Sequence, residues 1–229
     1  MNTVFSLKRF GMLFKKHTIE NYKGYLMSFF VLIGILILVI GFTNYHARQP
    51  MPLKEQYSFF MLFFLAGGTI FTSTIFANLG DKRKAIAAIT LPASTIEKFM
   101  VGWIYSFVLF QLIFTGVYYL IIIVVLSLGH WPAGTAPIMD VFSVEDKFYL
   151  IFVAYAFLHA CVIYGAIYFK NMHFIKTAFA FFIIVIVLWL LNDELLKLMT
   201  GLPTSSNPPF TDLSVQYMTE GNKVDTNVG

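Results

Sequence analysis

One stretch of the chain, Phe99 to Leu128, runs for thirty residues without a charged side chain. About 20 apolar residues cross the roughly 30 Å hydrocarbon core of a bilayer as a helix, so this stretch exceeds the length of one span. The composition agrees, because 58% of the residues are hydrophobic and only 12% are charged, against about 25% charged residues in an average soluble domain. The sequence therefore predicts a membrane protein.

Five windows of the sequence lie between flanking charges and have the length of a membrane span or nearly so. They are residues 24–47, 56–80, 99–128, 148–169 and 177–192. The last window is only roughly 24 Å long as a helix, but the long side chain of Lys176 can reach the interface and extend it. We predict an all-α, polytopic membrane bundle with spans at about 25–42, 58–79, 99–128, 148–169 and 174–192.

Lysine and arginine are distributed unevenly between the two sides that these spans define. With the N-terminus inside, eleven of the sixteen basic residues fall in cytoplasmic segments and five in outer ones. Because positively charged loops stay in the cytoplasm, the N-terminus is predicted to be cytoplasmic. The net charge of +4 then reflects topology and contact with anionic membrane lipids, and no nucleic-acid partner is expected.

The segment before the first span, residues 1–23, is amphipathic. Its apolar residues fall on one side of a 3.6-residue helix and its basic residues on the other. The apolar ones are Leu7, Phe10, Leu13 and Phe14, and the basic ones are Lys8, Arg9, Lys15 and Lys16. We predict a cytoplasmic interfacial helix that lies flat on the inner leaflet. It either anchors the topology only or acts as an elbow that moves with the first span.

The connection between the second and third spans, residues 80–98, is unusually long. It takes nineteen residues, whereas helices are commonly joined by about 2–8. Asp81 can cap a short helix that continues to Ile89 and carries three adjacent basic residues. Leu91-Pro92 then ends this helix. The pattern predicts a short helix held outside the membrane.

The third span has a sequence signal for its own beginning. Ser94 is followed three residues later by Glu97, which predicts a capping box and a helix that begins at about Thr95. A helix from Thr95 to Leu128 would be roughly 51 Å long, which is longer than the hydrocarbon core. The third helix is therefore predicted to project into the cytoplasm.

These features resemble the membrane subunits of type-2 ATP-binding-cassette (ABC) exporters, mainly over residues 1 to 110. The residues that carry the resemblance, besides the flat N-terminal helix, are Asn78-Leu79-Gly80-Asp81-Lys82-Arg83, Leu91-Pro92-Ala93-Ser94 and Glu97-Lys98-Phe99. In that family the segment between the second and third spans is a coupling helix seated on the ATPase subunit. A leucine-proline-small-serine stretch commonly follows it.

The resemblance implies a permease subunit, in a bacterial inner (plasma) membrane, that exports an unidentified substrate. The implied partners are a separate ABC ATPase subunit, a second permease chain in a homo- or heterodimer, and membrane lipids. The chain itself is expected to bind no cofactor, with ATP and Mg²⁺ on the ATPase, because it lacks a Gly-x-x-x-x-Gly-Lys-Ser/Thr loop. The implied ATPase-coupling residues are Asp81, Lys82, Arg83, Lys84, Leu91, Pro92, Ser94, Glu97 and Lys98. The implied interfacial-helix residues are Phe10, Leu13, Phe14, Lys15 and Lys16.

The chain departs from the family pattern at its C-terminal end. Family members usually have six spans with both ends in the cytoplasm, whereas this sequence provides five. Residues 193–229 are polar and contain Pro203, Pro208 and Pro209, so they are predicted to be a flexible tail. Either the chain is a shortened member, or the sixth span was lost, or residues 177–199 form a re-entrant element that returns the tail to the inside.

Polar and small residues within the spans are candidates for a transport path or for helix contacts. The second span has a small-residue face that includes Gly67, Gly68, Thr72 and Ser73, and Gln111 and His159 are polar residues in the middle of later spans. Close packing and hydrogen bonding between helices are the more ordinary roles of such residues. The more specific alternative is that these residues line the interface of a permease dimer or the transport path.

Other classes of membrane protein find less support in the sequence. The first four spans contain no Asp, Glu, Lys or Arg, which an ion-driven transporter would need at mid-membrane. The five histidines are scattered, and neither a His-Glu-x-x-His nor a Gly-x-Ser-x-Gly motif is present, so neither an enzyme nor a metal site is expected. The alternative function is a non-transporting scaffold or regulatory subunit of a membrane complex.

Overall fold

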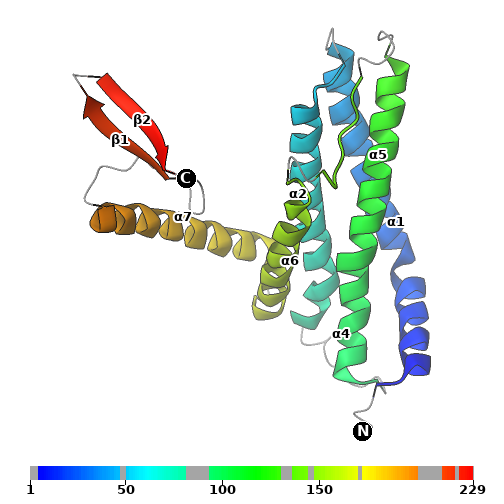
Figure 1. Cartoon of the computed structure of the whole chain (residues 1–229). Helices are drawn as coiled ribbons and strands as arrows, with labels where there is room; N and C mark the ends of the chain where they lie inside the picture. The colour runs from blue at the N-terminus through cyan, green and yellow to red at the C-terminus, as the bar shows by residue number, and fades with distance from the viewer. Residues whose placement is uncertain are drawn as a thin grey trace. The chain divides into compact units, whose positions relative to one another are not determined.

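The computed structural model describes residues 5–46, 50–80, 93–129, 136–143, 147–169, 172–200, 213–219 and 222–228. The chain divides into two compact units, Met1–Phe174 and Ile175–Gly229. The first unit is a bundle of long helices, and the second contains most of one further helix and a hairpin (Figure 1).

Four long helical stretches form the first unit, and Figure 1 shows them side by side. The first stretch is α1, Leu7–His46, and the second is α2, Leu53–Gly80. The third consists of α4, Thr95–Trp103, a π-helical turn η1, Ile104–Leu109, and α5, Phe110–Leu128. The fourth is α6, Leu150–Tyr168.

The described C-terminal residues contain a helix and two strands. Helix α7 runs without a break over His173–Thr200, so the structure does not contain the re-entrant element considered for residues 177–199. It is followed by two antiparallel strands, β1, Leu213–Thr219, and β2, Asn222–Val228, with Leu213 opposite Val228. Strand β1 alternates apolar and polar residues over positions 213–217, a pattern that is typical of a β-strand.

Within the described residues, five helices are long and apolar enough to cross a membrane: Leu7–His46, Leu53–Ala77, Thr95–Leu128, Leu150–Tyr168 and Phe174–Asn192. They coincide with the five predicted windows. The prediction of an all-α, polytopic helical bundle is therefore confirmed, and the chain has the helices of an integral membrane protein.

The N-terminal segment differs from the predicted interfacial helix. Residues 7–23 do not form a separate flat helix, because α1 continues unbroken from Leu7 through the first predicted span to His46. Helix α1 contains no proline and only the isolated glycines Gly11, Gly24, Gly34 and Gly41, so nothing in the backbone interrupts the hydrogen-bonded ladder. One face of the N-terminal part of α1 also packs against α4 and against Tyr105 of η1, and these contacts hold α1 to the third helix.

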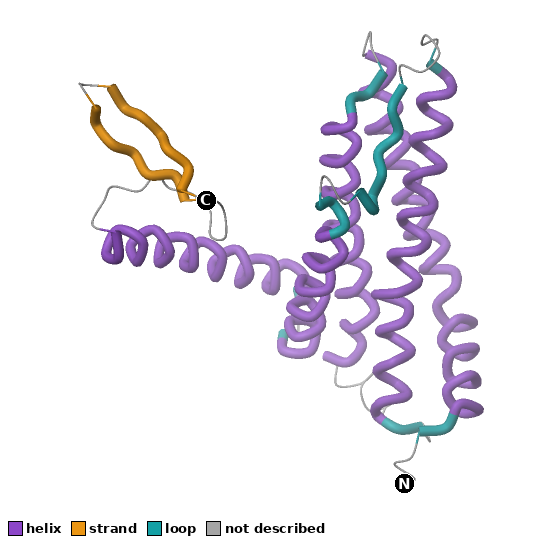
Figure 2. Tube along the Cα trace, in the orientation of Figure 1, coloured by secondary structure: helices purple, strands orange, loops and turns teal. Residues whose placement is uncertain are grey.

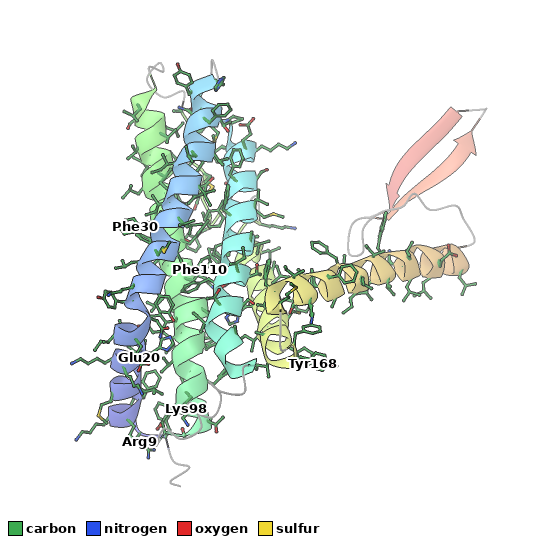
Figure 3. All side chains as sticks on the ribbon, turned by 180° about the vertical axis from the view of Figure 1, so that it is seen from behind. Arg9, Glu20, Phe30, Lys98, Phe110 and Tyr168 are labelled. Atoms are coloured by element: carbon green, nitrogen blue, oxygen red, sulfur yellow. The ribbon has the colours of Figure 1, made fainter. Side chains whose placement is uncertain are left out.

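Aromatic side chains fill the centre of the bundle between α2, α5 and α6. Phe64 is fully buried, and its ring centroid lies 5.4 Å from that of Phe114, 5.9 Å from that of Phe110 and 4.8 Å from that of Tyr155. Figure 3 labels Phe110 in the middle of this unit. Because lipid tails are as apolar as these rings, close packing rather than hydrophobic burial holds such helices together.

Candidate functional site

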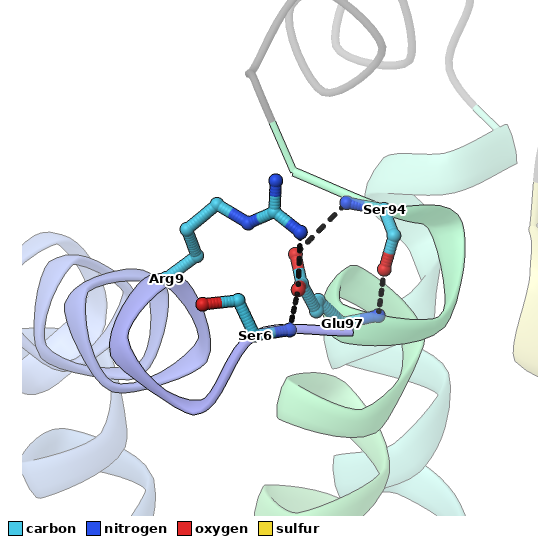
Figure 4. A network of polar contacts seen from close by, with 4 residues as sticks. All are labelled: Ser6, Arg9, Ser94 and Glu97. Carbon is cyan, nitrogen blue, oxygen red and sulfur yellow. Dashed lines mark hydrogen bonds and ion pairs between the residues drawn. The ribbon is translucent and has the colours of Figure 1, made fainter. Parts of the chain in front are cut away.

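The predicted capping box lies at the beginning of α4 and is confirmed (Figure 4). The Oγ of Ser94 accepts a hydrogen bond from the backbone N–H of Glu97 at 3.2 Å, and the Oε2 of Glu97 accepts one from the N–H of Ser94 at 2.9 Å. Both groups would otherwise be unsatisfied donors in the first turn of a helix. The capping box therefore defines where the third helix begins.

Glu97 also binds the N-terminal segment. Its Oε1 accepts a hydrogen bond from the N–H of Ser6 at 2.7 Å and lies 3.2 Å from the Nη2 of Arg9. The side chain of Glu97 is fully buried, so the carboxylate is enclosed by its partners. We call Ser6, Arg9, Ser94 and Glu97 the clasp, and the end of the bundle that carries it the Glu97 end. The clasp joins segments 91 residues apart in the sequence.

The clasp sets the protonation state of Glu97, which precedes the uncharged stretch that begins at Phe99. Hydrogen bonds from the backbone N–H groups of Ser6 and Ser94 hold the pKa of this carboxyl below its usual value, and the charge of Arg9 acts in the same direction. Burial opposes these effects without overcoming them. Glu97 is therefore a carboxylate at neutral pH.

Part of the predicted coupling segment lies outside the described residues, namely Asp81, Lys82, Arg83, Lys84, Leu91 and Pro92. The described members are Ser94, Glu97 and Lys98. Lys98 is half-buried, and Figure 3 shows it at the same end of the bundle as Arg9. The structure thus brings the last residues of the predicted coupling segment together with the beginning of α1.

The predicted interfacial-helix residues divide into a packed face and an exposed face. Phe10, Leu13 and Phe14 are half-buried, and the ring of Phe14 stacks on that of Tyr105 with centroids 4.9 Å apart. Lys15 and Lys16 are exposed, and Lys16 lies 3.7 Å from Glu20. Part of the predicted apolar face therefore contacts the third helix through Phe14, whereas Leu7 of the same face is exposed.

A polar cluster lies at η1, in the middle of the third helix. The N–H of Phe110 donates to the carbonyls of Tyr105 and Phe107 instead of that of Ser106, its partner in a regular α-helix. The Ser106 carbonyl accepts a hydrogen bond from the Tyr155 hydroxyl at 2.7 Å. Single π-turns are rare and are often found at functional sites. Tyr155 satisfies the carbonyl that the π-turn leaves open.

His159 completes this cluster. Its Nε2 lies 2.8 Å from the Oγ of Ser106, and both side chains are buried. The Oγ of Thr72 donates to the carbonyl of Gly68 at 2.7 Å and lies 3.5 Å from the Tyr155 hydroxyl. The structure thus brings the candidates Gly68, Thr72 and His159 together and joins their helices by hydrogen bonds.

Replacing Tyr155 by Phe tests the cluster. The change removes the hydroxyl that bonds the Ser106 carbonyl, and we expect a loss of about 1 kcal/mol, which is typical of a hydrogen bond between membrane helices. Unfolding of the purified protein in a denaturing detergent series measures the change. Tyr164→Phe, on an exposed part of α6, is the control, and an equal effect of both variants would contradict this assignment.

The remaining path candidates have different surroundings. Gly67 is half-buried and Ser73 is buried. Gln111 is half-buried, and its Nε2 has no hydrogen-bond partner. These three residues do not share a hydrogen bond with the cluster at Ser106. Gln111 is therefore the candidate whose amide N–H is left without a partner.

A second polar centre, which the sequence reading missed, lies at the opposite end of the bundle. Gln56 is fully buried, and its Nε2 donates to the carbonyls of Met51 at 2.9 Å and Pro137 at 2.8 Å. Its Oε1 accepts from the N–H of Met139 at 3.1 Å. Figure 2 shows residues 136–143, the docked segment, as a teal trace beside α2 and α5. Gln56 fastens this segment to α2.

Tyrosines attach the docked segment on both sides. The Tyr119 hydroxyl of α5 donates to the carbonyl of Met139 at 3.1 Å and accepts from the N–H of Val141 at 3.0 Å. The Tyr57 hydroxyl of α2 donates to the carbonyl of Asp140 at 3.2 Å. Both tyrosines lie within uncharged windows of the sequence, which is a visible signal, but the sequence does not reveal which backbone groups they bind.

The two glutamines give a matched test of these environments. Gln56→Leu would leave the carbonyl of Met51 and the N–H of Met139 unpaired, and both residues are buried, so we expect a cost of about 1–3 kcal/mol for each group. Gln111→Leu removes an amide that has an unpaired N–H, so it should be neutral or stabilising. Thermal unfolding in detergent measures the stability of both variants. Similar losses of stability would contradict the different roles assigned to Gln56 and Gln111.

Comparisons with known proteins add no further constraint, since no family model, curated protein or solved structure matches the chain. Within the part of the chain that the structure describes, no group of three or more His, Cys, Asp or Glu side chains could hold a metal ion. The clasp, the polar cluster and the docked segment are therefore the features that bear on function.

Proposed function

We propose that the chain is the permease subunit of an ABC exporter in a bacterial inner membrane, with its N-terminus in the cytoplasm. In this proposal a separate ATPase subunit binds ATP and Mg²⁺ and pushes on residues 80–98. A second permease chain completes the transport path. The chain itself carries out no chemistry on its substrate.

The observation that carries this proposal is the clasp. Packed side chains, networks of hydrogen bonds and ion pairs, and rigid helices can carry coupling between distant sites. Here Ser94 and Glu97 form the capping box of α4. Glu97 also accepts hydrogen bonds from Ser6 and Arg9 of the N-terminal segment. A displacement of the segment that ends at Lys98 would therefore move α1 and the third helix together.

The polar cluster at η1 supports the same proposal. It divides the third helix into α4, which carries the clasp, and α5, which packs in the aromatic core. A π-turn is a place where a long helix can change its direction or register at small cost. Under the proposal, α4 follows the ATPase while η1 adjusts the angle to α5.

The test is purification of the tagged protein from its native membrane, with mass spectrometry of the proteins that accompany it. We expect a stoichiometric soluble ATPase with a phosphate-binding loop. Replacing Lys82, Arg83 and Lys84 by Glu should reduce its recovery at least about tenfold. An ATPase surface that is complementary to these basic residues would repel acidic ones.

The control changes charge elsewhere on the same side. Lys15→Glu with Lys16→Glu alters two exposed residues of α1 and should leave ATPase recovery unchanged. Repeated absence of any ATPase, with the protein intact in the membrane, would contradict the exporter proposal and favour a scaffold. Equal loss with both charge variants would contradict a specific role of residues 82–84.

A further inference from the structure

A groove opens between α1 and α5 near the ends of these helices that lie opposite the Glu97 end. It has a volume of about 480 Å³, and its walls include Ile37, Gly41, Asn44, Leu120, Val124 and Leu128. The volume lies in the range of about 300–1,000 Å³ that is usual for sites of small molecules. Apart from the side chain of Asn44 and the neighbouring Tyr45, the groove is lined by aliphatic side chains and glycines.

Asn44 gives one wall of this groove an unusual polar group. The side chain is 8% exposed, and its Nδ2 donates to the carbonyl of Val125 at 3.3 Å, which joins α1 to α5. Its Oδ1 is buried and has no hydrogen-bond partner. Buried acceptors without a donor are rare in native proteins and call for a missing partner. A ligand in the groove can supply that donor.

The position of Asn44 along α1 indicates where such a donor would come from. Asn44 lies three residues before Ala47, the last residue of the uncharged window, and Arg48 follows in the sequence. Asn44 lies in the last turn of α1, which ends at His46, and a charged residue follows four positions later in the sequence, so we expect the amide near the boundary between acyl chains and headgroups. Donors at this depth belong to the polar part of a lipid, while the aliphatic walls extend toward the acyl region.

The walls of the groove favour a lipid over a water-soluble ligand. The side chains of Ile37, Leu120 and Leu128 are at least half exposed, which leaves an aliphatic surface continuous with the mouth of the groove. Gly41 provides the room, because a Cβ built on it would meet no atom within 4 Å. An acyl chain fits such a surface and loses no hydrogen bonds on entering it.

We propose that this groove binds one acyl chain of a bilayer phospholipid whose headgroup carries hydrogen-bond donors, as in phosphatidylethanolamine, and that Asn44 Oδ1 accepts a hydrogen bond from that headgroup. The proposal does not depend on the exporter function. It requires only that α1 and α5 cross a membrane, as their length and apolarity indicate.

Two lipids with identical acyl chains distinguish the proposal from non-specific lipid contact. Phosphatidylethanolamine has an ammonium group with N–H donors, whereas the trimethylammonium group of phosphatidylcholine has none. The full-length protein in detergent is mixed with equal amounts of both, and native mass spectrometry counts the retained lipid. We expect about threefold to tenfold more phosphatidylethanolamine, which is the effect of one hydrogen bond.

Three variants locate the bound lipid. Gly41→Leu fills the groove and should remove retention of the first lipid molecule of either kind. Gly34→Leu is the matched control, since Gly34 lies two turns away on nearly the same face of α1, outside the groove, and also has no atom within 4 Å of an added Cβ. Asn44→Leu should abolish the preference between the lipids while retaining acyl-chain binding.

Several outcomes would overturn the proposal. Equal retention of both lipids by the unaltered protein would contradict the hydrogen bond to Asn44 Oδ1. Undiminished lipid retention by Gly41→Leu would show that the lipid does not bind in the groove. If Gly41→Leu does not fold, Val124→Phe fills the groove from α5 and carries the same expectation. Crosslinking of Val124→Cys to its equivalent in a second copy, with no lipid retained, would show that protein and not lipid covers the groove.

Discussion

Replacing Gly68 by Ala is expected to destabilise the bundle by about 1–3 kcal/mol, which is the usual cost of forcing extra atoms into a packed core. A Cβ at this position would clash with the ring of Tyr155 and lie 2.8 Å from the Cε1 of Phe110. Both rings belong to the buried aromatic core, so neither can move without disturbing its neighbours. The close contact of α2 with α6 would be lost.

Thermal unfolding in detergent measures this effect, with a dye that reacts with the single thiol. Cys161 is half-buried on α6 and becomes accessible on unfolding. For a chain of this size, 1 kcal/mol corresponds to about 2–4 °C in the unfolding midpoint. Gly67→Ala is the matched control, because its Cβ would meet atoms only at 3.6 Å or beyond, an ordinary contact. Equal shifts in both variants would contradict the steric explanation.

Replacing Glu97 by Ala is expected to release the N-terminal segment from α4. The N–H groups of Ser6 and Ser94 and the guanidinium of Arg9 would lose their common acceptor. We expect amide hydrogen exchange around residues 6–14 to become at least about tenfold faster, because local opening no longer breaks these bonds. Trypsin should also cleave after Arg9 more readily. Under the exporter proposal, stimulation of the ATPase would fall as well.

An exposed ion pair on α1 gives the control for this variant. Glu20 lies 3.7 Å from Lys16, and both side chains are largely exposed. Such pairs contribute little, so Glu20→Ala should leave the exchange rates and tryptic cleavage nearly unchanged. If Glu97→Ala behaves like Glu20→Ala, then the clasp does not hold the N-terminal segment.

The clasp should depend on pH in a direction that its hydrogen bonds determine. The pKa of Glu97 is lower in the folded protein than its ordinary value of 4.5. The stabilisation is therefore fully present above pH 4.5 and is lost as the pH falls through the lower, folded pKa. Exchange rates of the unaltered protein and of Glu97→Ala should differ at neutral pH and converge in acid. A constant difference down to pH 2 would contradict this role of the carboxylate.

Local and compositional features were predictable from the sequence. The five spans follow from runs of uncharged residues, because a bilayer imposes a minimum length and apolarity that composition alone reveals. The capping box of Ser94 and Glu97 was also predictable, since its partners are three residues apart and satisfy each other within one turn. The possible roles of residues 81–92 remain predictions from the sequence.

Contacts between distant segments were not predictable, and these decide the candidate sites. The stacking of Phe14 on Tyr105 joins α1 to the third helix, and the second function of Glu97 depends on Ser6, which lies 91 residues away. Gln56 looked like the first residue of an uncharged window, although it fastens Pro137 and Met139.

The sequence by itself therefore determined that this is a membrane protein with five long apolar helices. The length and apolarity that a bilayer requires are properties of each segment alone. Only the tertiary structure decided which faces meet, that Gly68 must lack a side chain, and that Asn44 keeps an unpaired oxygen beside a groove. The physical reason is that steric fit and hydrogen-bond pairing depend on the distances between helices. Those distances arise only when all the helices pack together.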